Sequence, residues 1–323
     1  MNTKLIKKSI PTLGIVIPAY NEEAVLHLTI AKLEPIFQDL IAQHIILPDS
    51  FILFVDDGSK DDTWSIVDSL CNQNKSYKGI KLSQNYGHQK ALLAGLLSAK
   101  NRADCIISMD ADLQDDINLL HEFIDSYIEG YEIVYAVRKT RTKDTFLKRH
   151  TAALFYKFMN KLGVKLKQNH ADYRLASKRV LDELEQFNEV NVFLRGLFPL
   201  LGFNSKEIYY NRQERAAGET KYPLKKMISF AIEGITSFSI IPLRLITTLG
   251  FIIFILSLLM STYVLFESLF FNNVVRGWSS LALSLYMLSG IQLLSLGVIG
   301  EYVGKIYTET KRRPRFIIEK QLI

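Results

Sequence analysis

The chain has 323 residues and a formal net charge of +6, with 48% hydrophobic and 22% charged residues. This length allows one large or two modest domains. Its two cysteines, Cys71 and Cys105, form no CxxC pair, so neither a disulfide framework nor a zinc site is expected, and a reducing compartment is favoured. The basic residues gather beside apolar runs near the C-terminus, which argues against a nucleic-acid partner.

The N-terminal part of the chain alternates short β-branched runs with helical patterns. This βαβα rhythm predicts an α/β domain with a largely parallel sheet covered by helices. The expected strands are Leu13–Ile17, Phe51–Val55, Ile80–Ser83, Cys105–Met109 and Glu132–Val137. The expected helices are Glu23–Leu40, Thr63–Asn72, Gln89–Ala99 and Ile117–Glu129.

Polar clusters follow three of these strands, at Tyr20–Glu22, Asp56–Ser59 and Asp110–Asp115. Ligands of such sheets bind outside the carboxyl ends of the strands, so we expect the three clusters to meet there. Carboxylates gathered this closely repel each other unless a cation or hydrogen-bond donors compensate them. The chain has neither GxGxxG nor GxxxxGK[ST]. We therefore expect a divalent cation to neutralise substrate phosphates.

The run Asp110-Ala111-Asp112-Leu113-Gln114 is the centre of the expected site. Along an extended chain, alternation would place the side chains of Asp110, Asp112 and Gln114 on the same side. Carboxylate and amide oxygens suit Mg²⁺ and Mn²⁺ as ligands. A DxD motif alone is a weak signal. DxDxQ at a strand end, beside two further acidic clusters, predicts a metal-dependent site.

The residues after the expected sheet have mixed patterns. A helix is expected over Phe146–Leu162, and residues 163–222 are more irregular, with a strand-like Glu207–Asn211. From Leu224 to Phe238, apolar side chains recur at helical spacing, with lysines alongside. A helix lying at the membrane surface explains this pattern, and an ordinary helix packed on the catalytic core explains it equally well.

Two long runs without charge follow, Leu245–Phe266 and Gly277–Gly300. Each is long enough to cross a hydrocarbon core of about 30 Å as a helix. The alternative is a pair of buried core helices, but such helices rarely stay apolar on every side. Basic residues flank the pair, whereas the connection holds one basic residue, Arg276. The positive-inside rule then places both ends of the hairpin in the cytoplasm, where the basic flanks would attract anionic lipids.

Several motifs together form a specific pattern. They are Pro18-Ala19-Tyr20-Asn21-Glu22, Val55-Asp56-Asp57-Gly58-Ser59, Asn85-Tyr86-Gly87, Asp110 to Asp115, Ala171-Asp172-Tyr173-Arg174-Leu175, and Arg215 to Tyr222. This pattern resembles family-two glycosyltransferases with the GT-A fold, and within them the polyprenyl-phosphate glycosyltransferases, related to ArnC and the dolichol-phosphate mannose synthases. Pro242-Leu243-Arg244 and Gly300-Glu301-Tyr302 are most similar to the GtrB type. The resemblance covers nearly the whole chain and implies a Rossmann-like GT-A domain with a C-terminal two-helix transmembrane hairpin.

The resemblance implies a role for each matching residue. Those implied for the nucleotide-sugar pocket are Pro18, Ala19, Tyr20, Glu22, Asp56, Asp110 and Ala111, with Asp56 accepting a hydrogen bond from the base. The implied ligands of Mg²⁺ or Mn²⁺ are Asp110, Asp112 and Gln114. Those implied to contact phosphates are Arg138, Arg215 and Lys221, in keeping with the phosphate affinity of guanidinium and ammonium groups. His88 and Lys90 are instead interpreted as helix-start residues that face solvent.

Asp172 is the general base that the resemblance implies, but the implied acceptor hardly needs one. A phosphate monoester has a second pKa of about 6, so it is already largely dianionic at neutral pH. Asp172 can instead orient the acceptor, hold Arg174 or position a basic neighbour. We therefore expect Asp172→Asn to reduce activity less than Asp112→Ala.

These motifs predict an inverting, metal-dependent transfer of a sugar from a nucleotide sugar to polyprenyl (undecaprenyl) phosphate. UDP-glucose is the favoured donor, and the lipid-linked product would serve cell-surface glycan modification. We expect a cytoplasmic GT-A domain at 1–222, an amphipathic juxtamembrane helix at 223–243, two transmembrane helices at 244–304 and a basic cytoplasmic tail at 305–323. This organisation predicts a multi-pass protein of the inner (cytoplasmic) membrane in contact with its lipids.

Alternatives stay open at this level. UDP-N-acetylglucosamine, UDP-galactose and GDP-mannose are further donors, and the oligomeric state, a homo-oligomer included, is undetermined. A glycosyltransferase acting on a sugar hydroxyl is the second hypothesis, but such synthases have a QxxRW motif, which is absent here. The intact Asp110, Asp112 and Gln114 argue against a non-catalytic membrane scaffold. A small channel is disfavoured because the apolar runs carry no intramembrane charge.

Overall fold

The computed structural model describes residues 7–139, 170–190, 192–211 and 278–323, together with single positions between 243 and 259. The helices expected at Phe146–Leu162 and 223–243 and most of the first apolar run lie outside the described residues. Arg215 and Lys221 lie outside them as well. The chain divides into two compact units, of which the first comprises Met1–Tyr156, Leu166–Tyr222 and Arg312–Ile323.

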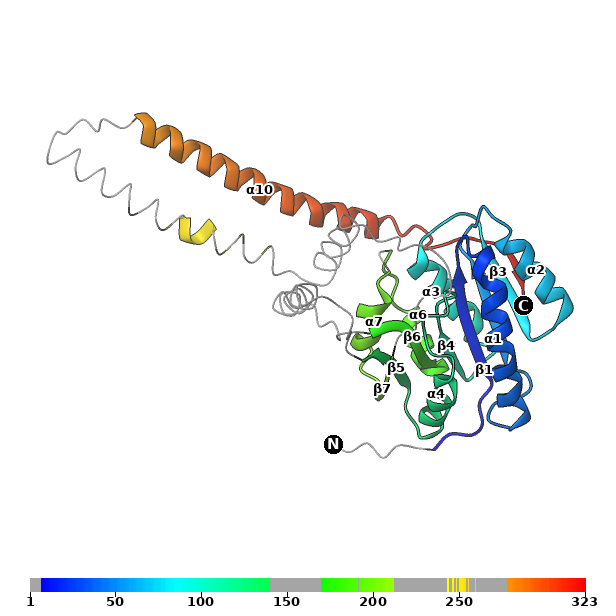
Figure 1. Ribbon diagram of the computed structural model, residues 1–323. Coiled ribbons are helices and arrows are strands. Elements are labelled where there is room, and N and C mark those ends of the chain that lie inside the picture. Colours follow the sequence, from blue (N-terminus) through cyan, green and yellow to red (C-terminus); the bar gives the residue numbers. More distant parts are fainter. Residues whose placement is uncertain are drawn as a thin grey trace, which may run out of the picture. The chain divides into compact units, whose positions relative to one another are not determined.

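A mixed eight-stranded sheet forms the centre of the first unit, in the order β7-β5-β6-β4-β1-β2-β3-β8 (Figure 1). Its elements along the chain are β1 (Leu13–Ala19), α1 (Glu23–Ala42), β2 (Phe51–Asp56), α2 (Thr63–Gln73), β3 (Tyr77–Leu82), α3 (His88–Ala99), β4 (Cys105–Ser108), α4 (Leu119–Ile128), β5 (Ile133–Arg138), β6 (His170–Ser177), α6 (Lys178–Glu185), α7 (Leu194–Leu200), β7 (Ser205–Tyr210) and β8 (Ile318–Leu322). Strands β4, β1, β2 and β3 run parallel, whereas β6 and β8 are antiparallel to their neighbours β4 and β3. The predicted α/β class is confirmed, with a mixed sheet in place of a largely parallel one.

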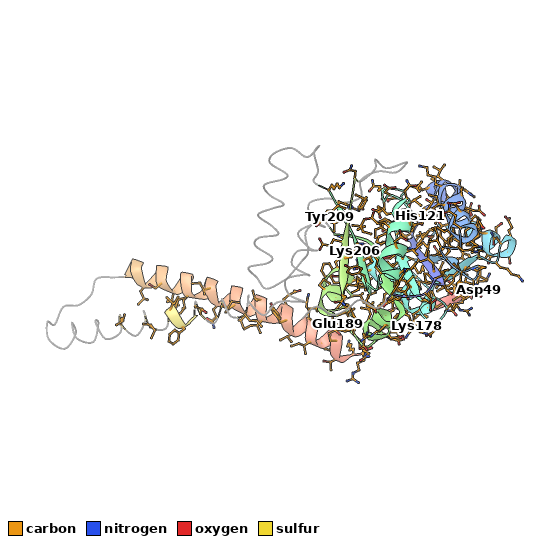
Figure 2. All side chains as sticks on the ribbon, turned by 90° about the horizontal axis from the view of Figure 1, so that it is seen from below. Asp49, His121, Lys178, Glu189, Lys206 and Tyr209 are labelled. Atoms are coloured by element: carbon orange, nitrogen blue, oxygen red, sulfur yellow. The ribbon has the colours of Figure 1, made fainter. Side chains whose placement is uncertain are left out.

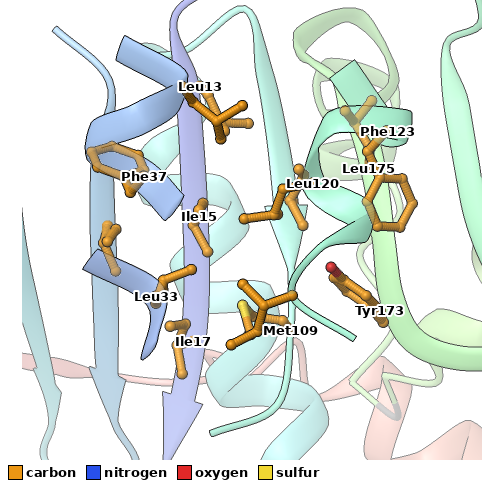
Figure 3. Close-up of a cluster of buried hydrophobic side chains, with 14 of the residues drawn as sticks. Leu13, Ile15, Ile17, Leu33, Phe37, Met109, Leu120, Phe123, Tyr173 and Leu175 are labelled. Carbon is orange, nitrogen blue, oxygen red and sulfur yellow. The ribbon is translucent and has the colours of Figure 1, made fainter. Parts of the chain in front are cut away.

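Helices cover both faces of the sheet, which is why β1, β2 and β4 consist entirely of buried residues. On one face, Ile15 of β1 packs in a cluster with Phe37 of α1 and Phe123 of α4 (Figure 3). On the other face α3 comes so close that a Cβ added at Gly95 would lie 2.4 Å from Cγ1 of Val16. Figure 2 shows polar side chains such as Asp49 at the periphery of this packed body.

Strand β6 lies in a region for which the sequence predicts irregular structure. It runs antiparallel between β4 and β5, with Ser108 of β4 opposite Arg174. Two charged residues, Asp172 and Arg174, are buried in it and interrupt the apolar pattern by which a central strand is recognised. The helix that follows begins at a cap, because Oγ of Ser177 accepts a hydrogen bond from the backbone N–H of Val180 at 3.3 Å.

The last residues of the chain, within the basic tail expected over 305–323, pair with the sheet of the first unit. Residues 318–322 form the edge strand β8, where Nζ of Lys81 lies 3.3 Å from Oε1 of Glu319. Nη1 of Arg315 donates to the carbonyl oxygen of Phe187 at 2.7 Å. From its sequence alone this segment looks like a polar tail, because edge strands commonly carry charged side chains, which discourage further strand pairing.

The second unit contains helix α10, Trp278–Thr310, which includes the second apolar run from its second residue onward (Figure 1). Among the described residues, no helix has both the length and the apolar character that a membrane span requires. The membrane hairpin stays a prediction from the sequence.

Candidate active site

The strand directions bring the predicted clusters to one edge of the sheet. β1, β2 and β4 are parallel, so the segments after Ala19, Asp56 and Ser108 leave at the same edge. β6 is antiparallel to β4 and therefore starts there, which places Asp172 beside the end of β4. β5 and β7 also end at this edge, with Arg138 in register with Tyr210.

Asp56 presents an unpaired carboxylate oxygen at this edge. Its side chain is buried, and Oδ1 accepts a hydrogen bond from the backbone N–H of Ser59 at 3.1 Å. Oδ2 is buried and has no hydrogen-bond partner within the described part of the chain. Burial raises the pKa of this carboxyl group. A buried hydrogen-bond acceptor without a partner among the described residues is suited to accept a hydrogen bond from a ligand.

The loops after β1 and β2 are fastened to each other by hydrogen bonds. The backbone N–H of Asn21 donates to Oγ of Ser59 at 3.0 Å, and that of Glu22 donates to Oγ1 of Thr63 at 2.9 Å. Pro18 and Ala19 are the last residues of β1, and Tyr20 follows them half-buried. The structure thus brings the four predicted pocket residues of this segment next to the carboxyl end of β2, where Asp56 lies.

Asp57 holds the loop that leads into α3. Its buried carboxylate accepts hydrogen bonds from the backbone N–H groups of Tyr86, at 2.7 Å, and Gly87, at 2.9 Å. α3 begins directly afterwards, so these bonds fix where His88 and Gln89 enter the site.

The acidic run after β4 is a turn, not the extended segment assumed from the sequence. Leu113 has a φ of 55°, and the backbone N–H of Gln114 donates to Oδ1 of Asp112 at 3.2 Å. The carbonyl oxygen of Ala111 accepts a hydrogen bond from Oγ1 of Thr29 at 2.6 Å, which ties the run to α1. Side-chain hydrogen bonding of an aspartate to the backbone two residues on favours turns over strands, so simple alternation does not hold here.

The same run carries carboxylate oxygens that accept no hydrogen bond from the described residues. Oδ1 of Asp110 and Oδ2 of Asp115 are buried without hydrogen-bond partners among the described residues. Burial and the charge of Asp110 raise the pKa of Asp115 to about 6. No group of three or more His, Cys, Asp or Glu side chains in the described residues is arranged to hold a metal ion. Magnesium is commonly bound by one or two carboxylates plus substrate phosphates. The carboxylates of the run after β4 fit such a cation.

Arg138 lies at this edge but is engaged by the protein. Its Nε donates to the hydroxyl oxygen of Tyr210 at 3.1 Å, and Nη2 lies 3.5 Å from Oδ1 of Asp115. The Tyr210 hydroxyl donates to the same carboxylate oxygen of Asp115. In this arrangement Arg138 holds Asp115 of the acidic run in position. A contact of Arg138 with a phosphate would be additional to these protein contacts.

Asp172 is enclosed by hydrogen-bond donors. Its Oδ1 lies 2.6 Å from Nη2 of Arg174 and 3.1 Å from Nε of Arg195. Its Oδ2 lies 2.9 Å from Nη2 of Arg195 and 3.0 Å from Nε2 of Gln89. Oε1 of Gln89 in turn accepts from the backbone N–H of Leu194 at 3.1 Å, so α3, β6 and α7 converge on one carboxylate. We call Asp172, Gln89, Arg174 and Arg195 the Asp172 cluster.

The electrostatics of the cluster keep Asp172 ionised. Its side chain is only 3% exposed, and burial alone would raise its pKa. The charge of Arg195, the contact with His88 and the charge of Arg174 outweigh burial and hold the pKa well below its usual range. A carboxylate this strongly stabilised in its charged form is a poor proton acceptor.

His88 does not simply face solvent, as the sequence analysis expects. Its Nε2 lies 3.5 Å from Oδ1 of Asp110 and 3.5 Å from Oδ2 of Asp172. Desolvation would lower its pKa, but its contact with Asp172 and the charge of Asp110 raise it to about 9. His88 therefore carries positive charge between the acidic run and the Asp172 cluster.

Gln89 and Arg195 were not among the predicted site residues. Gln89 opens a helix of ordinary pattern, which hides its role in the sequence. Arg195 offers one signal, because it is the single charged residue of the otherwise apolar stretch Val192–Phe203. A lone charge in such a stretch indicates a buried or functional partner.

Residues 14–185 match Glycosyl transferase family 2. The chain belongs to this glycosyltransferase family. It is 53% identical over 317 residues to the uncharacterized glycosyltransferase YkoT of Bacillus subtilis, with 98% of this chain and 94% of that protein covered. It is 37% identical over 309 residues to a bactoprenol glucosyl transferase of Shigella phage SfII, with 95% and 97% covered. Among solved structures, a mannosyl-3-phosphoglycerate synthase from Rubrobacter xylanophilus has 17% identity and a TM-score of 0.46, with 74% of this chain and 75% of that chain covered.

As a family 2 member, the protein is a glycosyltransferase. The matched range begins in β1 and ends in α6, so it contains Asp56, the acidic run after β4 and Asp172. Arg195 lies beyond it, in α7.

Proposed function

We propose that this glycosyltransferase transfers a sugar, with inversion, from a nucleotide sugar to the phosphate of polyprenyl phosphate. The observation that carries the proposal is the state of Asp172, which is buried, charged and bound to Arg174 and Arg195. A sugar hydroxyl needs a base to remove its proton, and this carboxylate is a poor one. A phosphate dianion needs none at neutral pH. The similarity to bactoprenol glucosyl transferases over nearly the whole chain supports the same acceptor.

The donor would lie across the carboxyl ends of β1, β2 and β4. Oδ2 of Asp56 would accept a hydrogen bond from the base, with Ala19 beside it in the sheet, and its lack of a partner among the described residues supports this role. Asp110, Asp112 and Gln114 would hold Mg²⁺ or Mn²⁺, which supplies charge to the departing diphosphate. UDP-glucose is the favoured nucleotide sugar.

The acceptor phosphate would attack the anomeric carbon from the side of the Asp172 cluster. The bond from the anomeric carbon to the diphosphate oxygen breaks as the bond to the acceptor oxygen forms, and the nucleoside diphosphate leaves. Asp172 takes no proton in this scheme and keeps Arg174 and Arg195 in place. Arg138 keeps Asp115 in place, while Arg215 and Lys221 stay proposed phosphate contacts.

The acceptor is a lipid, so we propose that the enzyme works at the cytoplasmic face of the cytoplasmic membrane. The two apolar runs would form a membrane hairpin within 244–304, and 223–243 would lie at the membrane surface. Such anchoring would hold the lipid phosphate near the donor and reduce the entropic cost of their encounter.

Purified full-length protein incubated with undecaprenyl phosphate and a panel of nucleotide sugars tests the reaction. We expect transfer from one donor, with UDP-glucose favoured. We also expect EDTA to abolish turnover and added Mn²⁺ or Mg²⁺ to restore it, because the diphosphate would otherwise leave without charge compensation. Full activity in EDTA would overturn the metal assignment, and transfer from none of the donors would overturn the proposed function.

A further inference from the structure

The Asp172 cluster carries more positive than negative charge. One carboxylate, that of Asp172, stands between the guanidinium groups of Arg174 and Arg195. His88 contacts the same carboxylate, with its Nε2 3.5 Å from Oδ2. A carboxylate that only had to be neutralised would need a single guanidinium group. With the second guanidinium group, the four side chains of the cluster together carry a net positive charge.

The excess charge is accessible at Arg195. The Asp172 and Arg174 side chains are each 3% exposed, whereas that of Arg195 is 39% exposed. Arg174 is further enclosed, because its guanidinium carbon lies 4.5 Å from the centre of the Phe198 ring. An anion arriving at this edge of the sheet can therefore reach the positive charge of Arg195 but not that of Arg174.

Arg195 is also held in a fixed orientation. Its Nε and Nη2 both bind Asp172, at 3.1 and 2.9 Å. Gln89 fixes the backbone beside it by accepting from the N–H of Leu194 while donating to Asp172. A guanidinium group oriented in advance loses less conformational entropy when it binds a ligand.

We propose that Arg195 binds the phosphate of the acceptor, and that Asp172 and Gln89 position it for this contact. This inference rests on the proposed function and adds the residue that receives the acceptor. Guanidinium groups suit phosphates because their N–H donors match the phosphate oxygens in pairs. The location fits, because His88 contacts both Asp172 of the cluster and Asp110 of the proposed donor site, each at 3.5 Å.

The test compares Arg195→Gln and Arg195→Lys with wild-type full-length protein in detergent. The acceptor is undecaprenyl phosphate, and the donor is the nucleotide sugar that the wild type uses. We expect kcat/KM for the acceptor to fall about 10- to 100-fold in Arg195→Gln, the size of one charged hydrogen-bonded contact. KM for the nucleotide sugar should stay within about twofold. Arg195→Lys should recover part of the loss, because it restores the charge but not the planar fork.

Arg179→Gln is the matched control, since Arg179 lies on α6 with its guanidinium carbon 5.2 Å from the Phe203 ring. It should leave both KM values unchanged. Calorimetric measurement of UDP binding to each variant shows whether the donor site is still folded. Unchanged acceptor kinetics in Arg195→Gln, or a rise in the KM of the nucleotide sugar alone, would overturn the assignment while leaving the proposed function intact. A wild type that transfers nothing to undecaprenyl phosphate would overturn both.

Discussion

Asp112→Ala is expected to lower kcat/KM for sugar transfer about 10³-fold. Asp112 stands in the turn after β4, where its Oδ1 shapes the backbone at Gln114 and its carboxylate is a proposed ligand of the divalent cation. Loss of the cation would leave the diphosphate without charge compensation as it departs, and a metal contributes several kcal/mol of such stabilisation. Initial rates at saturating metal, with the product separated by chromatography, measure the effect.

Asp116→Asn is the control for this substitution, because it removes a negative charge from the same acidic run. Oδ1 of Asp116 accepts a hydrogen bond from the backbone N–H of Asn118 at 3.1 Å, and asparagine keeps an oxygen there. Its activity should stay close to wild type. If both variants lost activity equally, the general acidity of the loop, and not a ligand at Asp112, would explain the result.

Asp172→Asn should lower the free energy of unfolding by about 3 kcal/mol, because it leaves Arg174 buried beside a neutral group. Its effect on kcat/KM should be smaller than that of Asp112→Ala, since no proton passes to Asp172. Chemical denaturation measures the first quantity. Asp182→Asn is the control, because the Asp182 side chain is 45% exposed and Lys100 keeps a second ion pair with Glu185, so the loss should be at most about 1 kcal/mol.

The pH dependence separates a positioning role of Asp172 from that of a base. A carboxyl group whose pKa is lowered on folding stabilises the protein above its unfolded pKa, and this contribution is lost as pH falls through the folded pKa. Between pH 5 and 8 Asp172 should therefore not titrate. The fall in kcat/KM towards acid, expected at about pH 6 from the acceptor phosphate, should persist in Asp172→Asn. Its disappearance in that variant would identify Asp172 as the base.

The sequence predicts the first half of the sheet well because its signals are local. β1, β2 and β4 are short apolar runs bounded by polar turns, and each helix between them shows its own periodicity. The rule that ligands bind at the carboxyl ends of strands predicts that Asp56 and Asp110 lie at the same end of the sheet, and the parallel pairing of β2 and β4 with β1 agrees with this.

The remaining features depend on contacts between distant parts of the chain. β6 carries two buried charges that compensate each other and are completed by partners on α3 and α7, so its own pattern does not identify it as a central strand. Arg195 lies 23 residues from Asp172 in the sequence, and no spacing rule connects the two. β8 pairs with a strand more than two hundred residues earlier, at Gly79 to Leu82. Such pairings are set by tertiary packing, which local patterns do not report.

The most direct test of the account asks whether the acceptor must carry a phosphate. Full-length protein with its preferred nucleotide sugar is offered undecaprenyl phosphate and, in parallel, undecaprenol, which presents a hydroxyl on the same chain. Mass spectrometry of the extracted lipids reads the product. We expect one added sugar on undecaprenyl phosphate and none on undecaprenol, because Asp172, which Arg174 and Arg195 hold in its charged form, is a poor base for a hydroxyl. Comparable transfer to undecaprenol would contradict it.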